Sequence, residues 1–159
     1  MTVARPSFAR DAGPLVAVDS GHFNYHTIDG LYGPFAALLR NDGFRVVDSR
    51  TPFTADSLAT INVLVISNAL PSANLETLSS PTPSAFTAAE VQTLKEWVAE
   101  GGSLLLITDH QPLAHAASRT RARLRIPPRG RSRTTVSANR AAERKRTGLL
   151  HARRWIIGG

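Results

Sequence analysis

Four short apolar runs constrain the fold of this chain more than any other feature of its sequence. The runs are PLVAVDS, FRVVDSR, INVLVISNA and SLLLITDH, and they predict strands at residues 15–19, 44–48, 61–67 and 103–108. Continuous apolar runs of this length are typical of strands that are buried on both faces of a sheet. The stretches between them carry helix signals, so the sequence predicts strands that alternate with helices.

Three helices are predicted between these strands. In YGPFAALLRNDG, Pro34 suits the first helical turn and Gly43 suits the position just past the helix end. FTADSLAT reads as a short helix with Thr54 as its N-cap. In FTAAEVQTLKEWVAEGG, Thr87 and Glu90 form a Thr-x-x-Glu capping box. Strand and helix in this order predict a parallel sheet covered by helices, with right-handed crossovers.

The chain changes character near residue 118. Its 159 residues suffice for one domain, which we place at residues 14–117, after an irregular N-terminus at residues 1–13. Residues 1–117 contain six Lys and Arg against eleven Asp and Glu, whereas residues 118–159 contain thirteen against one. The second segment lacks a sustained apolar period, so we expect an irregular or disordered Arg-rich tail there.

Two interpretations of this tail compete with plain disorder. A basic arm of this kind could bind nucleic acid through phosphate contacts. Alternatively, residues 118–159 are translated out of frame. Residues 118–131 can be back-translated so that the next frame reads AELARAFGFRLADG, an amphipathic helix followed by the start of a strand. On this frameshift interpretation the domain is truncated, the tail packs nowhere on it, and the sheet edge stays exposed.

Each predicted strand ends in polar residues. The carboxyl ends of parallel strands meet at one edge, and open α/β sheets bind ligands in the crevice outside that edge. We therefore expect one concavity, centred on Asp19, His22 and Asp109. Its expected lining is Asp19, His22, Asp48, Asn68, Asp109 and His110, with Arg50 and Ser67 as further ligand-binding candidates.

The polar residues at the strand ends fit two kinds of chemistry, and they also have an explanation that involves no function. Asp19, His22, Asp109 and His110 are candidate catalytic groups, because a carboxylate that orients an imidazole makes an acid–base pair. Asp19, His22 and Asp109 are also candidate ligands for a divalent metal. Strand ends are nevertheless polar in any such sheet, because they meet water and cap loops. Among the histidines, His22 close to Asp19 is favoured over His26 as a site residue.

The pattern from VAVDSGH through FTAAEVQTLKEWVAEGGSLLLITDH resembles the class I glutamine amidotransferase-like superfamily, in a bacterial branch of unknown function near the trehalose-utilisation-type domains. The resemblance covers residues 14–117 and implies a three-layer flavodoxin-like sandwich, with the first strand between the second and the third. In amidotransferases the strand after the Gly-Gly pair leads to a nucleophilic Cys. Here that turn reads Ile107, Thr108, Asp109, His110, and the chain has no Cys. The resemblance therefore implies the pocket without cysteine-dependent glutamine hydrolysis.

Two classes of function follow. The missing nucleophile favours an uncharacterised or non-catalytic domain that binds a small ligand or a protein partner at the sheet edge. The Asp and His residues there support the alternative of a metal-assisted hydrolase. The absence of Cys excludes disulfides and thiolate chemistry. No apolar run is long enough for a signal peptide or a membrane span, so a cytoplasmic location is expected.

Overall fold

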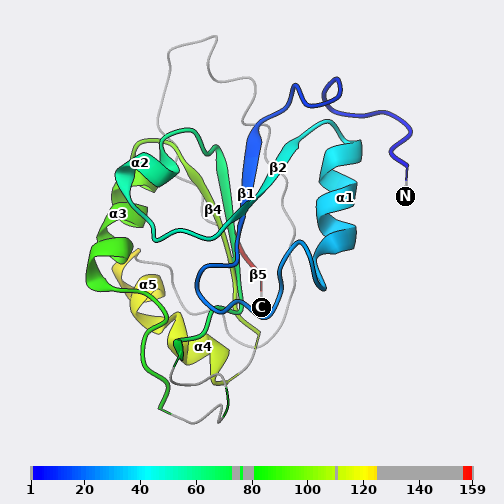
Figure 1. Cartoon of the computed structure of the whole chain (residues 1–159). Coiled ribbons are helices and arrows are strands. Elements are labelled where there is room, and N and C mark those ends of the chain that lie inside the picture. The colour runs from blue at the N-terminus through cyan, green and yellow to red at the C-terminus, as the bar shows by residue number, and fades with distance from the viewer. Residues whose placement is uncertain (1, 73–75, 77–80, 110, 125–155, 159) are drawn as a thin grey trace.

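The computed structural model describes residues 2–72, 76, 81–109, 111–124 and 156–158, which form an α/β sandwich around a parallel sheet (Figure 1). Its strands are β1 (Leu15–Asp19), β2 (Arg45–Ser49), β3 (Val63–Ser67), β4 (Ser103–Ile107) and β5 (Ile156–Gly158). Their order is β2-β1-β3-β4-β5, and every neighbouring pair is parallel. The four predicted strands and the place of the first between the second and third are confirmed.

Helices cover both faces of this sheet. α1 (Gly33–Asn41) lies on one side, whereas α2 (Ala55–Leu58), α3 (Ala88–Ala99), α4 (Leu113–Ala116) and α5 (Ser118–Arg123) lie on the other (Figure 1). The three predicted helices are therefore confirmed, and the arrangement has the three layers expected of a flavodoxin-like fold.

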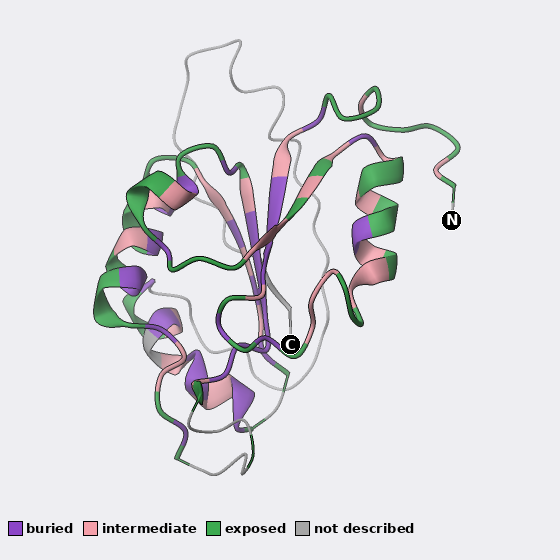
Figure 2. Ribbon diagram, in the orientation of Figure 1, coloured by how far each residue is buried: buried purple, intermediate pink, exposed green. Residues whose placement is uncertain are grey.

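Alternation along the strands divides the apolar core between the two faces. Figure 2 shows that the central strands are buried along most of their length. Val16, Val18 and Val65 pack toward α1, against partly buried side chains that include Phe35 and Leu39. The larger core lies on the opposite face and contains Ala17, Leu58, Leu64, Ile66, Val91, Leu94, Val98, Leu104 and Leu106. Both faces are covered, which explains why the strands read as continuous apolar runs.

Local signals in the sequence fix where the helices begin and end. At the start of α3, the Glu90 N–H donates to Thr87 Oγ1 (3.2 Å) and the Thr87 N–H donates to Glu90 Oε2 (2.9 Å), which confirms the capping box. Thr54 caps α2 in the same way, together with Ser57. Gly43 follows α1 with φ +90°, a left-handed conformation that favours glycine. The α3 cap holds Glu90 at the carboxyl edge of the sheet.

The expectation that the chain packs nowhere after residue 118 is wrong for the described residues. Thr120 and Leu124 are buried, and Leu124 belongs to the same core as Leu94. β5 also pairs with β4, with Ile156 opposite Leu105. The buried positions 117, 120 and 124 follow helical spacing, a signal that the arginines between them obscured.

The rest of the tail, residues 125–155 and 159, lies outside the described residues. Nucleic-acid binding through its basic residues stays a prediction, and so does the frameshift. In the described part of the chain, no helix combines the length and apolar character needed to cross a membrane.

Candidate functional site

The polar residues at the strand ends form three hydrogen-bonded groups rather than one. Asp19 and His22 join Glu90 in the first group. Asp48 and Arg50 form the second, and Ser67, Asn68 and Asp109 join His26 in the third. Two surface cavities of the described chain are lined by members of the second and third groups, and neither is lined by Asp19 or His22. Neither of these two cavities brings all the predicted residues together, and His110 lies outside the described residues.

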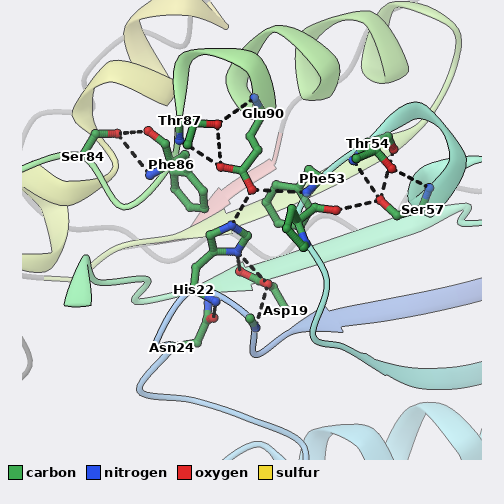
Figure 3. Close-up of polar contacts among 12 residues, drawn as sticks. Asp19, His22, Asn24, Phe53, Thr54, Ser57, Ser84, Phe86, Thr87 and Glu90 are labelled. Atoms are coloured by element: carbon green, nitrogen blue, oxygen red, sulfur yellow. Dashed lines mark hydrogen bonds and ion pairs between the residues drawn. The ribbon is translucent and has the colours of Figure 1, made fainter.

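In the first group the His22 ring is held between two carboxylates (Figure 3). Its Nδ1 lies 3.0 Å from both carboxylate oxygens of Asp19, and its Nε2 lies 2.9 Å from Glu90 Oε1. The rings of Phe53 and Phe86 pack against the imidazole, with centroids 4.5 and 4.9 Å from it. Asp19 is completely buried, and His22 and Glu90 are buried as well. We call this set the Asp19–His22–Glu90 cluster.

The cluster favours a charged imidazole. Burial alone lowers the pKa of His22, but the hydrogen bonds and charges of Asp19 and Glu90 outweigh it, so the pKa of His22 is raised. Burial likewise raises the pKa of Glu90, yet hydrogen bonds from Thr87 and His22 bring it below its ordinary value. An imidazolium between two carboxylates is the state in which both ring nitrogens donate.

This arrangement leaves His22 without a free nitrogen. Both ring nitrogens are engaged with buried carboxylates, so in this arrangement neither presents a lone pair to a substrate proton or a metal ion. Within the described ranges, no three Asp, Glu or His side chains are placed to hold one metal ion. Through the contact of His22 with Glu90, Asp19 and His22 therefore connect the end of β1 to the start of α3.

The second group is partly exposed and internally paired, with Asp48 half-buried and Arg50 exposed. Ser20 Oγ donates to Asp48 Oδ1 (2.5 Å), and Arg50 bridges Asp48 and Asp29, with its Nη2 2.9 Å from Asp29 Oδ2. Burial raises the pKa of Asp48, but the hydrogen bonds from Ser20 and Arg50 bring it below the ordinary value. The cavity beside this group, of about 390 Å³, lies between β2 and α2 and is otherwise lined largely by apolar and hydroxyl side chains.

The third group surrounds a cavity at the carboxyl edge of the sheet. His26 Nδ1 lies 3.2 Å from both Ser67 Oγ and Asn68 Nδ2, and Asn68 Nδ2 donates to Asp109 Oδ2 (3.1 Å). The cavity has a volume of about 280 Å³. We call it the His26 cavity, and it is lined by Tyr25, His26, Asn68, Leu70, Asp109, Pro112 and Leu113.

The topology of the sheet explains why these side chains meet. The strand order reverses between β1 and β3, and in sheets of this type the crevice at such a point is where ligands bind. His26 lies on the loop after β1, whereas Asn68 directly follows β3. Asn68 has φ +50°, a left-handed conformation that Asn tolerates better than most residues. The His26 cavity therefore occupies the position where the fold builds ligand sites.

Hydrogen bonding orients the polar side chains around the His26 cavity relative to one another. The Asp109 N–H donates to Asn68 Oδ1 (3.3 Å), which identifies the amide oxygen and directs the amide NH₂ toward Asp109 and His26. A neutral His26 ring that accepts from this NH₂ at Nδ1 carries its proton on Nε2. His26 consequently offers an N–H donor on the side away from Asn68.

The two histidines differ in whether they line a cavity. Proximity to Asp19 favoured His22, but that same contact saturates its ring, whereas His26 lines a cavity. The sequence placed His26 on the loop after the first strand, which was the available signal. Glu90 was recognised as a helix cap, but its contact with His22 spans 68 positions and has no local sequence signal.

Comparison with known proteins gives distant structural likeness only. No family model and no curated protein sequence matches the chain. Among solved structures, the mmIFT52 N-terminal domain is 17% identical with a TM-score of 0.44, covering 58% of this chain and 35% of that one. A ThuA-like protein from Bacteroides uniformis ATCC 8492 is 16% identical with a TM-score of 0.41, covering 74% of this chain and 40% of that one. This chain thus spans less than half the length of either.

Proposed function

We propose that this chain is a binding domain that holds a small, uncharged polar ligand in the His26 cavity. The observation that carries the proposal is the convergence of His26, Asn68 and Asp109, from three separate segments, into one hydrogen-bonded set that lines a cavity outside the strand ends. A largely apolar cavity with a few fixed polar groups is the usual form of a small-molecule site.

The lining of the cavity selects the class of ligand. His26 supplies an N–H donor and Asp109 supplies a carboxylate, while Leu70, Pro112 and Leu113 supply apolar surface. The described lining contains one carboxylate, Asp109, and no Lys or Arg, so it favours a neutral ligand over an anionic one. A neutral group with an acceptor beside a donor, such as a carboxamide, is the simplest match.

A hydrolase has less support. A general base needs an unprotonated nitrogen that faces the substrate, but the contact with Asn68 favours the His26 form that carries its proton on Nε2. The Ser67 hydroxyl lies 3.2 Å from His26 Nδ1, but Ser67 is completely buried and does not line the cavity. The amidotransferase-like resemblance is consistent with a pocket at this edge, but a shared fold does not supply a reaction.

Acetamide and acetate test the proposal directly, because they have nearly the same shape and differ in charge. We expect acetamide to shift the amide NMR signals of Tyr25 and Asp109 in the full chain saturably, with a Kd of about millimolar for so small a ligand. Acetate is expected to leave them in place. His26→Phe is expected to abolish the acetamide response, whereas His115→Ala, on α4 outside the cavity lining, is expected to retain it.

Equal shifts with acetate and acetamide would contradict the proposed ligand class. An acetamide response that survives His26→Phe would contradict the proposed site. A complete lack of saturable response to acetamide would contradict the binding function itself.

A further inference from the structure

The loop between β1 and α1 connects the buried Asp19–His22–Glu90 cluster to the His26 cavity. It carries His22 and His26 only four residues apart, with one ring in the cluster and the other lining the cavity. The His22 carbonyl accepts from the Leu70 N–H (3.0 Å), and Leu70 lines the same cavity. A single hydrogen bond therefore connects the His22 backbone to the wall of the cavity.

Two further bonds attach this loop to the end of β3. Asn24 Nδ2 donates to the Ser67 carbonyl (3.3 Å), and the Tyr25 N–H donates to the Asn68 carbonyl (3.2 Å). Between the His22 and Asn24 anchors, Phe23 is exposed and has φ +48°, a left-handed conformation that is unfavourable for a bulky residue. A loop with a strained residue keeps this shape only while its anchors hold it.

The Asp19–His22–Glu90 cluster needs a proton on both ring nitrogens of His22, because each nitrogen faces a carboxylate. A neutral imidazole has one N–H, so it can donate to Asp19 or to Glu90 but not to both. Among the described residues, these two carboxylates are the charged groups paired with the ring, and its other neighbours are the rings of Phe53 and Phe86. A neutral ring would turn a lone pair toward one buried carboxylate.

His22 is the member of the cluster that deprotonation would release. Asp19 keeps a hydrogen bond from the Gly21 N–H, and Glu90 keeps those from Thr87 and the Phe53 N–H. The ring has no such second set of partners.

We propose that a proton held on His22 fixes the β1–α1 loop against the end of β3 and thereby controls occupancy of the His26 cavity. The statement about occupancy rests on the proposed function, whereas the statement about the loop does not. The raised pKa of His22 agrees with this geometry, because both carboxylates stabilise the imidazolium. His22 is thus a positioning residue for the cavity.

Amide hydrogen exchange on the ligand-free full chain tests the loop. We expect the protection factors of Tyr25 and Leu70, taken relative to Leu64 in the centre of β3, to fall about tenfold per pH unit above the His22 titration midpoint. Glu90→Gln provides the matched variant. Gln keeps the capping box with Thr87, and its NH₂ can donate to the Nε2 of a neutral His22 in place of the bond from the Phe53 N–H, so this fall is expected to disappear.

The outcomes separate the two parts of the proposal. Constant relative protection in the wild type, or an equal fall in Glu90→Gln, would overturn the role of the proton. Acetamide binding that weakens above the midpoint in the wild type but not in Glu90→Gln would support control of occupancy, and equal binding on both sides would overturn it. Failure of acetamide to bind at any pH would contradict the proposed function. The exchange result would still show whether the proton on His22 fixes the β1–α1 loop.

Discussion

At the scale of single residues, two histidines four positions apart have opposite situations. His22 is buried with both nitrogens occupied, whereas His26 lines a cavity and has one nitrogen engaged in the described part of the chain. The sequence predicted that Asp19 and His22 interact, and they do. It could not predict that Glu90 completes the contact from the other side, since that depends on how α3 packs on the sheet.

His22→Ala is expected to lower the free energy of unfolding by about 3–5 kcal/mol near pH 5.5, because it leaves two buried carboxylates without their shared cation. Denaturant titration of the full chain measures this change. His26→Ala is the matched control, and its loss is expected to stay near 1 kcal/mol because its ring is only partly buried. Similar losses for both variants would contradict a special role for His22 in stability.

The same cluster predicts how stability depends on pH. The pKa of His22 is raised, so its contribution is complete below about pH 6.5 and is lost as the pH rises through the folded-state value. The pKa of Glu90 is lowered, so its contribution is complete above about pH 4.3 and is lost as the pH falls through the folded-state value. The contribution of the pair is therefore greatest between these limits.

Free energies of unfolding measured across this pH range check the prediction in the wild type and in Glu90→Gln. The variant is expected to lose the Glu90 contribution on the acid side and part of the His22 contribution on the alkaline side. Two curves that run parallel throughout would show that the pair does not contribute.

At the scale of elements, local signals predicted the strands and the capped helices. The Thr87–Glu90 box and Gly43 succeeded because caps depend on residues within one turn. The expectation failed at α5, because its arginines hid the buried spacing of Ala117, Thr120 and Leu124. The candidate site was predicted only in part, since which side chains share a cavity is decided by packing between segments.

Thr120 provides a test of α5. Its buried Oγ1 has no hydrogen-bond partner among the described residues, so Thr120→Val is expected to raise the free energy of unfolding by about 1 kcal/mol. Thr87→Val is the control, because there the hydroxyl caps α3 and its loss is expected to cost about 1 kcal/mol. Chemical denaturation of both variants measures the difference, and destabilisation by Thr120→Val would contradict the packing of α5.

At the scale of the whole molecule, the described part of the tail belongs to the domain. Leu124 packs in the main core and β5 extends the sheet beside β4. The frameshift stays a prediction that the nucleotide sequence after codon 117 can test. With the codons chosen for that back-translation, positions 120 and 124 of the shifted frame read Leu and Phe, two apolar residues that suit buried sites.

Leu124→Ala tests whether this segment stabilises the domain. Because Leu124 is buried in the main core, the substitution is expected to cost about 2–5 kcal/mol in the free energy of unfolding. Arg123→Ala, at the exposed neighbouring position, is expected to change it by less than about 0.5 kcal/mol. Equal effects in thermal or chemical denaturation would mean that the chain beyond Ala117 does not pack on the core.

The proposed ligand class depends on an N–H donor that His26 presents to the cavity. Long-range ¹⁵N–¹H correlation NMR of the histidine rings reads this directly, because it shows which nitrogen of neutral His26 carries the proton. The hydrogen bonds among His26, Asn68 and Asp109 predict the proton on Nε2. A proton on Nδ1 would contradict the proposed ligand class, because it would place an acceptor in the cavity and make His26 a candidate general base.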